Sequence, residues 1–398
     1  MELLLNYLFA AGVVFSHIFG YAFSIISLFF IYKNWDDLKR EKIFQLICAF
    51  LVYGFILAVF STNKQNAFEE MFTYTSSWLP TFVLGYYIVN ITQKYKIIMM
   101  NLVVFSIIVC LSILSYYGLF YEQILGSFFS YKGVVLKAFL WHISLGAMCV
   151  AISSSCLIFL LFKQDLNNKK RMVLISFIIL FIVSLFLTGS RGYYIAGFIT
   201  YLSIFGLYFI KTKKIIVPAI IILSAVVFIT ILYFTNPYMQ QRIKNTSIYH
   251  ENSLTTRIIS YKTAMIIFKK KPIFGVGPRQ SVIQKEYIEN TQDNSGKARH
   301  MHSMYFNILS DFGLIGMILF SGLIFYIFKR LFYVYKNKKS LLALALIFCW
   351  ISILIGDNFD TILRGPRVAM EYFWMTGLVL GGTLAKNKKE EKNNEEQK

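Results

Sequence analysis

The sequence predicts an all-α, polytopic transmembrane helical bundle, and three observations support this class. Of the 398 residues, 57% are hydrophobic and only 15% are charged, whereas soluble domains are about 45–50% apolar and about 25% charged. Apolar runs of about 20 residues, the length that crosses a bilayer as a helix, recur along the chain. The short connections between them are alternately rich and poor in lysine and arginine. Barrel strands are excluded because they alternate in polarity and these runs do not.

Each apolar run after the first long stretch is expected to span the membrane once. These runs cover residues 43–60, 71–91, 97–117, 137–162, 172–188, 193–210, 215–235, 309–328, 340–356 and 368–385. Residues 3–32 form one longer stretch with Gly12, Ser16, His17 and Gly20 in its middle, which is either one long helix or two short ones. We therefore expect about 12 spanning helices (11–12).

The orientation follows from the connections, because lysine and arginine concentrate in cytoplasmic loops. The basic set comprises 33–42, 92–96, 163–171, 211–214 and 329–339, and the tail from Lys386 lies on the same side. The opposite set comprises 61–70, 118–136, 189–192, 236–305 and 357–367, and its short members are mostly poor in lysine. The first set is predicted to be cytoplasmic and the second extracytoplasmic.

One extracytoplasmic connection is much longer than the others. Residues 236–305 contain eleven lysines and arginines and four acids, and loops beyond about 15 residues are uncommon without a functional reason. This basic excess predicts an anionic ligand or, alternatively, a solvated basic face near lipid headgroups. By contrast, the charged, low-complexity residues 386–398 are predicted to be a disordered cytoplasmic tail.

The overall charge also bounds the partners. Lysine and arginine outnumber acids by 40 to 20, which gives a formal net charge of +20. In a soluble chain this excess would suggest nucleic acid, but cytoplasmic loops and anionic membrane lipids explain it in a multi-pass chain. We expect membrane lipids and no nucleic acid among the partners. The five cysteines lie in apolar runs without a CxxC pair, so no disulfide framework or zinc site is predicted.

The first polar motif is the short outer turn 188–192 (TGSRG), which joins two predicted spanning helices. An arginine at the membrane boundary is costly unless it has a partner or a water-filled cavity. The Arg191 guanidinium could donate two parallel hydrogen bonds to a phosphate, and the flanking glycines would let backbone or ligand approach closely. The alternative interpretation is an arginine that snorkels at a helix end.

The second motif, residues 255–271, predicts an amphipathic helix along the outer membrane surface. Thr255 is expected to cap its start and Pro272 to stop it. Arg257 and Tyr261 are four residues apart and should share a face, although Arg257 is alternatively an incidental arginine on a surface helix. The predicted apolar face consists of Leu254, Ile258, Tyr261, Met265 and Phe268.

The third region combines a glycine turn with a histidine. Residues 272–278 (PIFGVGP) are typical of a structural turn, since no Gly-Lys-Ser/Thr follows to make a nucleotide loop. His302 precedes a predicted spanning helix whose Gly313 and Gly316 would let another helix pack closely and direct the histidine inward. Histidine is the usual general base near neutral pH, and a packing role is the alternative. His300 is expected to lie elsewhere on that helix.

The last outer loop, residues 357–367, contains two acids and two arginines. Asp357 and Asp360 could bind a metal or act as a base. The alternative is that these acids pair with Arg364 or Arg367.

Three of these stretches, in this order, resemble the O-antigen ligase and O-antigen polymerase family of bacterial polytopic glycosyltransferases. The matching residues are Ser190-Arg191-Gly192, then Arg257-x3-Tyr261-x2-Ala264 with Pro272-Ile-Phe-Gly275-Val-Gly277, then His302-Ser303 with Gly313-x2-Gly316. The resemblance covers a core of residues 172–330, between N-terminal helices in 1–171 and C-terminal helices in 331–385. Two positions depart from the family's pattern: Tyr261 replaces a frequent tryptophan, and Ser303 replaces a frequent asparagine.

The resemblance implies a transferase in the bacterial inner (cytoplasmic) membrane that takes a glycan from an undecaprenyl-diphosphate carrier, with its active site outside. It also implies inversion of the anomeric centre without a metal, a nucleotide sugar or another cofactor. Arg191 and Arg257 would bind the diphosphate, and His302 would take the proton of the acceptor. The possible accessory residues are Tyr261, Asp357, Asp360, Arg364 and Arg367.

Three functions follow from these expectations. The first is an O-antigen ligase that passes the glycan to a hydroxyl on lipid A–core. The second is a surface-polysaccharide polymerase that passes it to another carrier-linked repeat unit. The third, from another class, is a polysaccharide or lipid transporter. Transporters usually place charges near the bilayer midplane and contain inverted repeats, whereas here the polar motifs gather at one face, so the enzyme is favoured.

Overall fold

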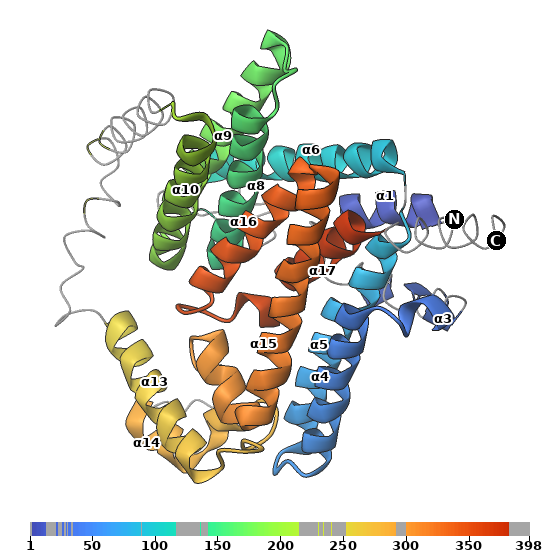
Figure 1. The fold of residues 1–398 in the computed structure, drawn as a ribbon. Helices are drawn as coiled ribbons and strands as arrows, with labels where there is room; N and C mark the ends of the chain where they lie inside the picture. The colour runs from blue at the N-terminus through green and yellow to red at the C-terminus, as the bar shows by residue number, and fades with distance from the viewer. Residues whose placement is uncertain are drawn as a thin grey trace, which may run out of the picture.

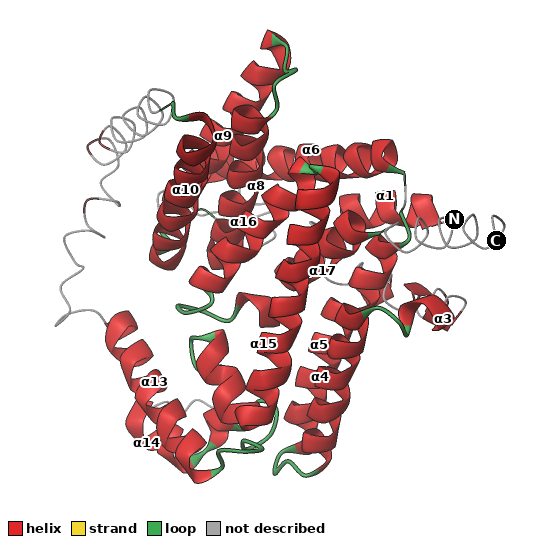
Figure 2. Cartoon of the chain, in the orientation of Figure 1, coloured by secondary structure: helices red, strands yellow, loops and turns green. Residues whose placement is uncertain are grey.

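The computed structural model describes residues 2–12, 35–88, 90–116, 142–214, 252–291 and 300–381, with a few single positions between them. Within these residues all regular structure is helical, as Figure 2 shows, and the predicted all-α class is confirmed. Some predictions lie outside the described residues. They concern most of the spanning helix 215–235, most of residues 13–30 in the stretch 3–32, and the tail 386–398.

The described helices follow the predicted runs in order (Figure 1). Their bounds are α1 Glu2–Gly12, α3 Trp35–Leu38, α4 Lys42–Val59, α5 Lys64–Tyr86, α6 Ile91–Tyr116, α8 His142–Phe162, α9 Asn168–Leu187, α10 Arg191–Thr212, α13 Asn252–Lys270, α14 Lys285–Thr291, α15 Met304–Lys338, α16 Leu341–Gly356 and α17 Pro366–Leu380. Short 3₁₀ turns occupy Ser281–Ile283 and Ile362–Arg364. Polar side chains cap several starts: Asn63, Asn167 and Ser340 accept backbone N–H groups at the beginnings of α5, α9 and α16.

The apolar helices make the chain a multi-pass membrane protein. Six described helices are long and apolar enough to cross a membrane: Lys42–Val59, Thr92–Leu114, His142–Phe162, Asn168–Leu187, Arg191–Thr212 and Met304–Lys338. Leu3–Gly12 and Leu341–Gly356 are shorter apolar helices. The helices α5 and α17 fall on the predicted spans 71–91 and 368–385, but neither is among the six. The predicted number of about 12 spans is therefore not confirmed.

The core of the bundle contains the close pair α5 and α17. A Cβ at Gly377 would meet the carbonyl oxygen of Phe82 at 2.0 Å, and one at Gly85 would meet that of Trp374 at 2.3 Å. Small residues of this kind let two helix backbones touch, which is how helices associate tightly in lipid. Trp78 and Trp374 are fully buried beside this contact. Nε1 of Trp78 donates to the carbonyl oxygen of Leu363 at 3.1 Å, which ties α5 to the loop between α16 and α17.

The helix α15 is broken at Gly313, whose φ of 65° and ψ of −161° are not helical. The turn 272–277 enters this break and pairs with the freed backbone groups. Val276 and Gly277 donate to the carbonyls of Ser310 and Asp311 at 3.0 and 2.8 Å, while Leu314 and Ile315 donate to those of Pro272 and Ile273 at 2.8 and 3.3 Å. The predicted turn is confirmed. The prediction that Gly313 contacts another helix is wrong, because a side chain there would collide with the turn at 2.4 Å.

The outer segment has a small core of its own. Figure 1 shows α13 and α14 beside each other at one end of the bundle, and Ala264, Ile267, Val282, Tyr287 and Met301 pack together between them. The helix α13 ends at Lys270, before Pro272, as predicted. The predicted cap at Thr255 is wrong, because α13 begins at Asn252 and Thr255 lies inside it. Its packed side also differs from the predicted apolar face: Ser260, Thr263, Ala264 and Ile267 are buried, whereas Ile258 is 46% exposed.

Candidate active site

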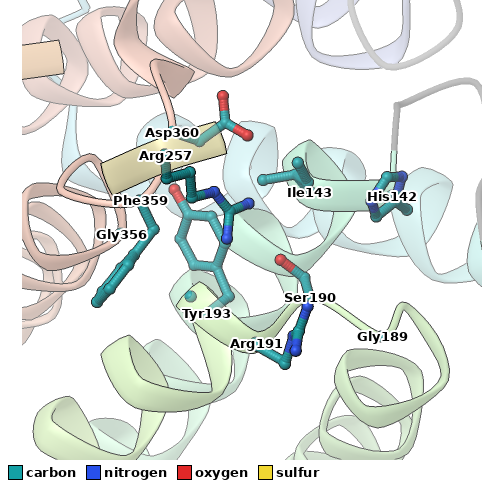
Figure 3. Close-up of a pocket in the computed structure, with 11 residues that line it drawn as sticks. His142, Ile143, Gly189, Ser190, Arg191, Tyr193, Arg257, Gly356, Phe359 and Asp360 are labelled. Atoms are coloured by element: carbon teal, nitrogen blue, oxygen red, sulfur yellow. The ribbon is translucent and has the colours of Figure 1, made fainter. Parts of the chain in front are cut away.

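A cavity of about 200 Å³ lies where the start of α10, the helix α13 and the loop after α16 meet. Figure 3 shows Ser190 and Arg191 on one side of it and Arg257 with Asp360 on the other. The lining residues are His142, Ile143, Gly189, Ser190, Arg191, Gly192, Tyr193, Arg257, Gly356, Phe359 and Asp360. Three motifs that are far apart in the sequence therefore reach one cavity.

Arg191 is the first residue of α10, and the turn before it is shaped by glycine. Gly189 has a φ of 64°, a conformation that residues with a side chain rarely adopt. The backbone N–H of Ser190 donates to Oγ1 of Thr188 at 3.3 Å. The N-terminus of a long helix carries a partial positive charge and N–H groups without partners within the helix. Together with the guanidinium of Arg191, it makes this side of the cavity suited to an anion.

The second glycine of this turn brings the last outer loop close. A Cβ at Gly192 would meet the Cβ of Phe359 at 2.8 Å, and one at Gly356 would meet the ring of Tyr193 at 2.5 Å. The predicted close approach at Gly192 is therefore made by the protein itself. The sequence did not point to Phe359, Tyr193 or Gly356, because their roles depend on which helix ends meet.

Arg257 projects from α13 into the cavity, and Figure 3 shows its guanidinium between Asp360 and Ser190. Its positive charge lowers the pKa of both His302 and Tyr261. Burial has the larger effect on each group: it lowers the pKa of His302 and raises that of Tyr261. The face that Arg257 and Tyr261 share thus points toward the cavity and the loop after α16. The interpretation of Arg257 as an incidental surface residue does not fit this placement.

Tyr261 joins three pieces of the site. Its hydroxyl lies 2.7 Å from the carbonyl oxygen of Asn358 and 3.1 Å from that of His302. Its ring stacks on Phe306 with a centroid distance of 4.7 Å. Burial raises the pKa of the phenol, which therefore stays protonated and can donate. Tyr261 positions the loop and the histidine segment relative to α13.

His302 lies just before α15, with a φ of 56° that is rare outside glycine. Its side chain is half-buried, and burial lowers the pKa of the imidazole, while nearby Asp360 raises it and Arg257 lowers it. A neutral imidazole at neutral pH can accept a proton. His302 is not among the lining residues, but Arg257 and Asp360, whose charges act on it, are.

His300 is not placed elsewhere on the helix, so that prediction is wrong. Both histidines precede α15, and their rings meet edge to face with centroids 4.9 Å apart. The reason is the positive φ of His302, which turns the chain before the helix starts.

The two acids of the last outer loop are buried and tie that loop together. Oδ1 of Asp357 accepts from the N–H of Ile362 at 2.7 Å, and Oδ1 of Asp360 accepts from that of Thr361 at 2.8 Å. Their carbonyl oxygens both receive the N–H of Met304, at 2.9 and 3.1 Å. Burial raises the pKa of each carboxyl group. Of the two acids, Asp360 lines the cavity.

The predicted pairing of these acids with Arg364 or Arg367 is wrong for Arg364. Its guanidinium makes a two-pronged ion pair with Glu70 of α5, and both side chains are largely buried. Arg367 lies in the first turn of α17, outside the cavity lining. The sequence reasoning missed Glu70, although an acid at the boundary of a predicted spanning helix signals a buried partner.

The arrangement brings two guanidinium groups, a helix N-terminus and a largely buried carboxyl group together at one cavity, and the charges of Arg257 and Asp360 act on the nearby imidazole of His302. Such a set can hold a diphosphate and accept a proton from a second substrate. Among the described residues, no group of three or more His, Cys, Asp or Glu side chains is placed to hold a metal ion.

Comparison with known proteins agrees with the motifs. No curated protein matches the chain. Residues 175–321 match the family described as O-antigen ligase. The matched segment contains Arg191, Arg257 and His302 and ends before Asp357 and Asp360. Residues 175–321 of this multi-pass membrane protein are thus similar to the O-antigen ligase family.

Proposed function

We propose that this protein moves a glycan from an undecaprenyl-diphosphate carrier to an acceptor hydroxyl, as an O-antigen ligase that attaches O-antigen to lipid A–core. The observation that carries the proposal is the single cavity of about 200 Å³ lined by both Arg191 and Arg257. These residues come from α10 and α13, so the shared cavity depends on the fold. Two guanidinium groups at one cavity match a diphosphate, which is the leaving group of the transfer.

In the proposed reaction the acceptor oxygen attacks the anomeric carbon from the side opposite the diphosphate. A carbon–oxygen bond forms to the acceptor, the bond to the diphosphate breaks, and the anomeric centre inverts. Arg191, Arg257 and the N-terminus of α10 stabilise the negative charge that develops on the diphosphate. No step calls on a metal or a nucleotide sugar.

His302 is the proposed base that takes the proton of the acceptor hydroxyl. Its lowered pKa keeps the imidazole neutral and ready to accept at neutral pH. Asp360, whose charge acts on His302, would stabilise the imidazolium that forms. Tyr261 and the loop acid Asp357 hold this segment in place through the hydrogen bonds described above.

The reaction would take place at the extracytoplasmic face of the bacterial inner membrane. The basic connections predict that the starts of α10 and α15 and the loop 357–367 all lie outside. A total of about 12 spans, which includes predicted spans outside the described residues, would put these three segments on the same outer side. A prenyl carrier in the bilayer could then present its diphosphate to the cavity at the membrane boundary.

The decisive experiment is transfer by the purified protein, with an undecaprenyl-diphosphate-linked glycan as donor and lipid A–core as acceptor. We expect lipid A–core that carries the glycan, and loss of this product in Arg257→Ala. Longer glycans that remain on the carrier would instead identify a polymerase. Movement of the donor across vesicles without any new glycosidic bond would identify a transporter and overturn the proposal.

A further inference from the structure

The segment 300–303 is held in an unusual backbone conformation by two side chains. The N–H of His302 donates to Nδ1 of His300 at 3.2 Å. The carbonyl oxygen of His302 accepts from the Tyr261 hydroxyl at 3.1 Å. A positive φ in a residue other than glycine persists only where surrounding contacts stabilise it. Here both the N–H and the carbonyl oxygen of His302 are hydrogen-bonded.

This contact also decides which nitrogen of His300 carries the proton. A ring nitrogen that accepts a hydrogen bond is unprotonated, so a neutral His300 carries its proton on Nε2. Nε2 of His300 lies 4.0 Å from Oδ1 of Asp360, which is beyond hydrogen-bond length, so a neutral ring turns its N–H dipole toward the carboxyl group without donating to it. One imidazole therefore reaches the backbone of the proposed base with one nitrogen and a carboxyl group of the cavity wall with the other.

We propose that His300 is a positioning residue for the transfer: Nδ1 sets the backbone of His302, and the Nε2–H dipole faces the Asp360 carboxylate and favours its charged form. The inference rests on the proposed function, since it gives His302 and Asp360 their roles. When His302 takes the proton of the acceptor, an ionised and correctly oriented Asp360 stabilises the imidazolium. The other charged or titratable groups that act on this cluster are Arg257 and Tyr261 of α13, and Arg364 at the far end of the loop.

Two substitutions separate the two contacts. In His300→Asn, the short amide can still accept from the N–H two residues on, as asparagine does in turns, but it cannot reach Asp360. In His300→Gln, the longer amide can reach Asp360 but is poorly placed to accept from His302. His300→Ala removes both contacts. Lys285→Gln on α14 is the matched control, because its ion pair with Glu289 is exposed and outside the site.

The measurement is kcat, donor KM and the dependence of kcat on pH for each purified full-length variant. We expect His300→Ala to lower kcat by about 10–100-fold with little change in donor KM, because a displaced base costs rate more than binding. His300→Gln should lower kcat and leave the fall in kcat at low pH, the acid limb of the profile, at the wild-type position. His300→Asn should keep more of kcat but move the acid limb to lower pH, because Asp360 without the facing N–H protonates more readily and then no longer raises the pKa of His302.

Wild-type kcat and an unchanged acid limb in His300→Ala would overturn the inference. An equal loss in all three His300 variants, with an unmoved acid limb and reduced thermal stability, would also overturn it in favour of a purely structural role. Arg257→Ala is measured alongside. If Arg257→Ala fails to transfer while His300→Ala remains fully active, this inference alone is overturned. If both remain fully active, the proposed function is overturned with it.

Discussion

Two groups of residues at the site are built in different ways. The cationic group consists of Arg191 at the first position of α10 and Arg257 on α13, both on regular helices that reach the cavity. The proton-accepting group consists of His302 and Asp360, which lie in irregular segments before α15 and after α16, and of these two Asp360 lines the cavity. In this second group the N–H of Thr361 donates to Asp360, and the Tyr261 hydroxyl reaches the carbonyl oxygen of His302. The first group is arranged to receive negative charge from a ligand, and the second holds a proton-accepting group in place.

Both groups must lie on the extracytoplasmic side of the membrane, and cysteine labelling tests this placement directly. A cysteine at Glu289 of α14 should react with an impermeant thiol reagent added to intact cells, because this residue belongs to the outer segment. A cysteine at Asn337, near the end of α15, should react only after the membrane is opened. The wild-type protein, with its five native cysteines, is the control. The reverse pattern would contradict the placement of the cavity.

Removal of the base should have the largest effect on rate. His302→Ala is expected to lower transfer by about 10²–10⁴-fold, the usual contribution of a general base, while the donor still binds through the arginines. Wild-type transfer should also fall as the pH decreases and the imidazole protonates. Because burial lowers the pKa of His302, this acid limb should lie below the ordinary value of about 6.5. Parallel loss of donor binding would argue against a base.

The buried ion pair tests whether an arginine near the site is structural. Glu70→Gln would leave the buried guanidinium of Arg364 without its charge partner, and breaking such a pair costs about 3–5 kcal/mol. Thermal unfolding in detergent should therefore shift to a lower temperature. The exposed neighbour Glu69, which contacts Arg279, is the matched control as Glu69→Gln. An unshifted transition in Glu70→Gln would mean that the pair contributes little.

Substitutions in the cationic group should have the opposite effect to Glu70→Gln: transfer is lost and folding stays normal. Arg191→Lys keeps the charge but loses the planar fork that binds a phosphate. Arg191→Lys and Arg257→Ala are each expected to lower transfer by about 10²–10³-fold, as loss of a charge-stabilising donor does. Detergent-solubilised yield and thermal transition should match the wild type. Full activity in either variant would remove that arginine from the diphosphate site.

The smallest effect is expected at Tyr261, which links the helix of Arg257 to the segments of His302 and Asp360. Tyr261→Phe keeps the stacking on Phe306 but loses the hydroxyl that reaches Asn358 and His302. A hydrogen bond contributes about 0.5–1.5 kcal/mol, so kcat should fall by up to about tenfold. Tyr261→Ala should fall further, because the ring contact is also lost. Equal rates for the wild type and Tyr261→Phe would mean that the ring alone positions the segment.

Much of the fold could be predicted from the sequence, because apolar length and helical spacing are local properties. The helices α4, α6, α8, α9, α10 and α15 fall on predicted runs. The break at Gly313 could not be predicted, because it exists only where the turn 272–277 replaces helix hydrogen bonds. The start of α13 at Asn252 was also missed, because Thr255 is an equally good cap by type alone.

Sequence by itself determined the helical class and predicted the cationic group of the candidate site: a guanidinium at a membrane boundary is costly, so Arg191 stands out in an otherwise apolar context. It also pointed to Arg257 and His302 through their motif, which lies within the matched family segment. Only the tertiary structure decided their partners. Glu70 binds Arg364 across the bundle, His300 contacts both His302 and Asp360, and Asp360 lines the same cavity as the arginines. The physical reason is that buried charges and positive φ values are stabilised by contacts between distant segments, which appear only when the helices are packed.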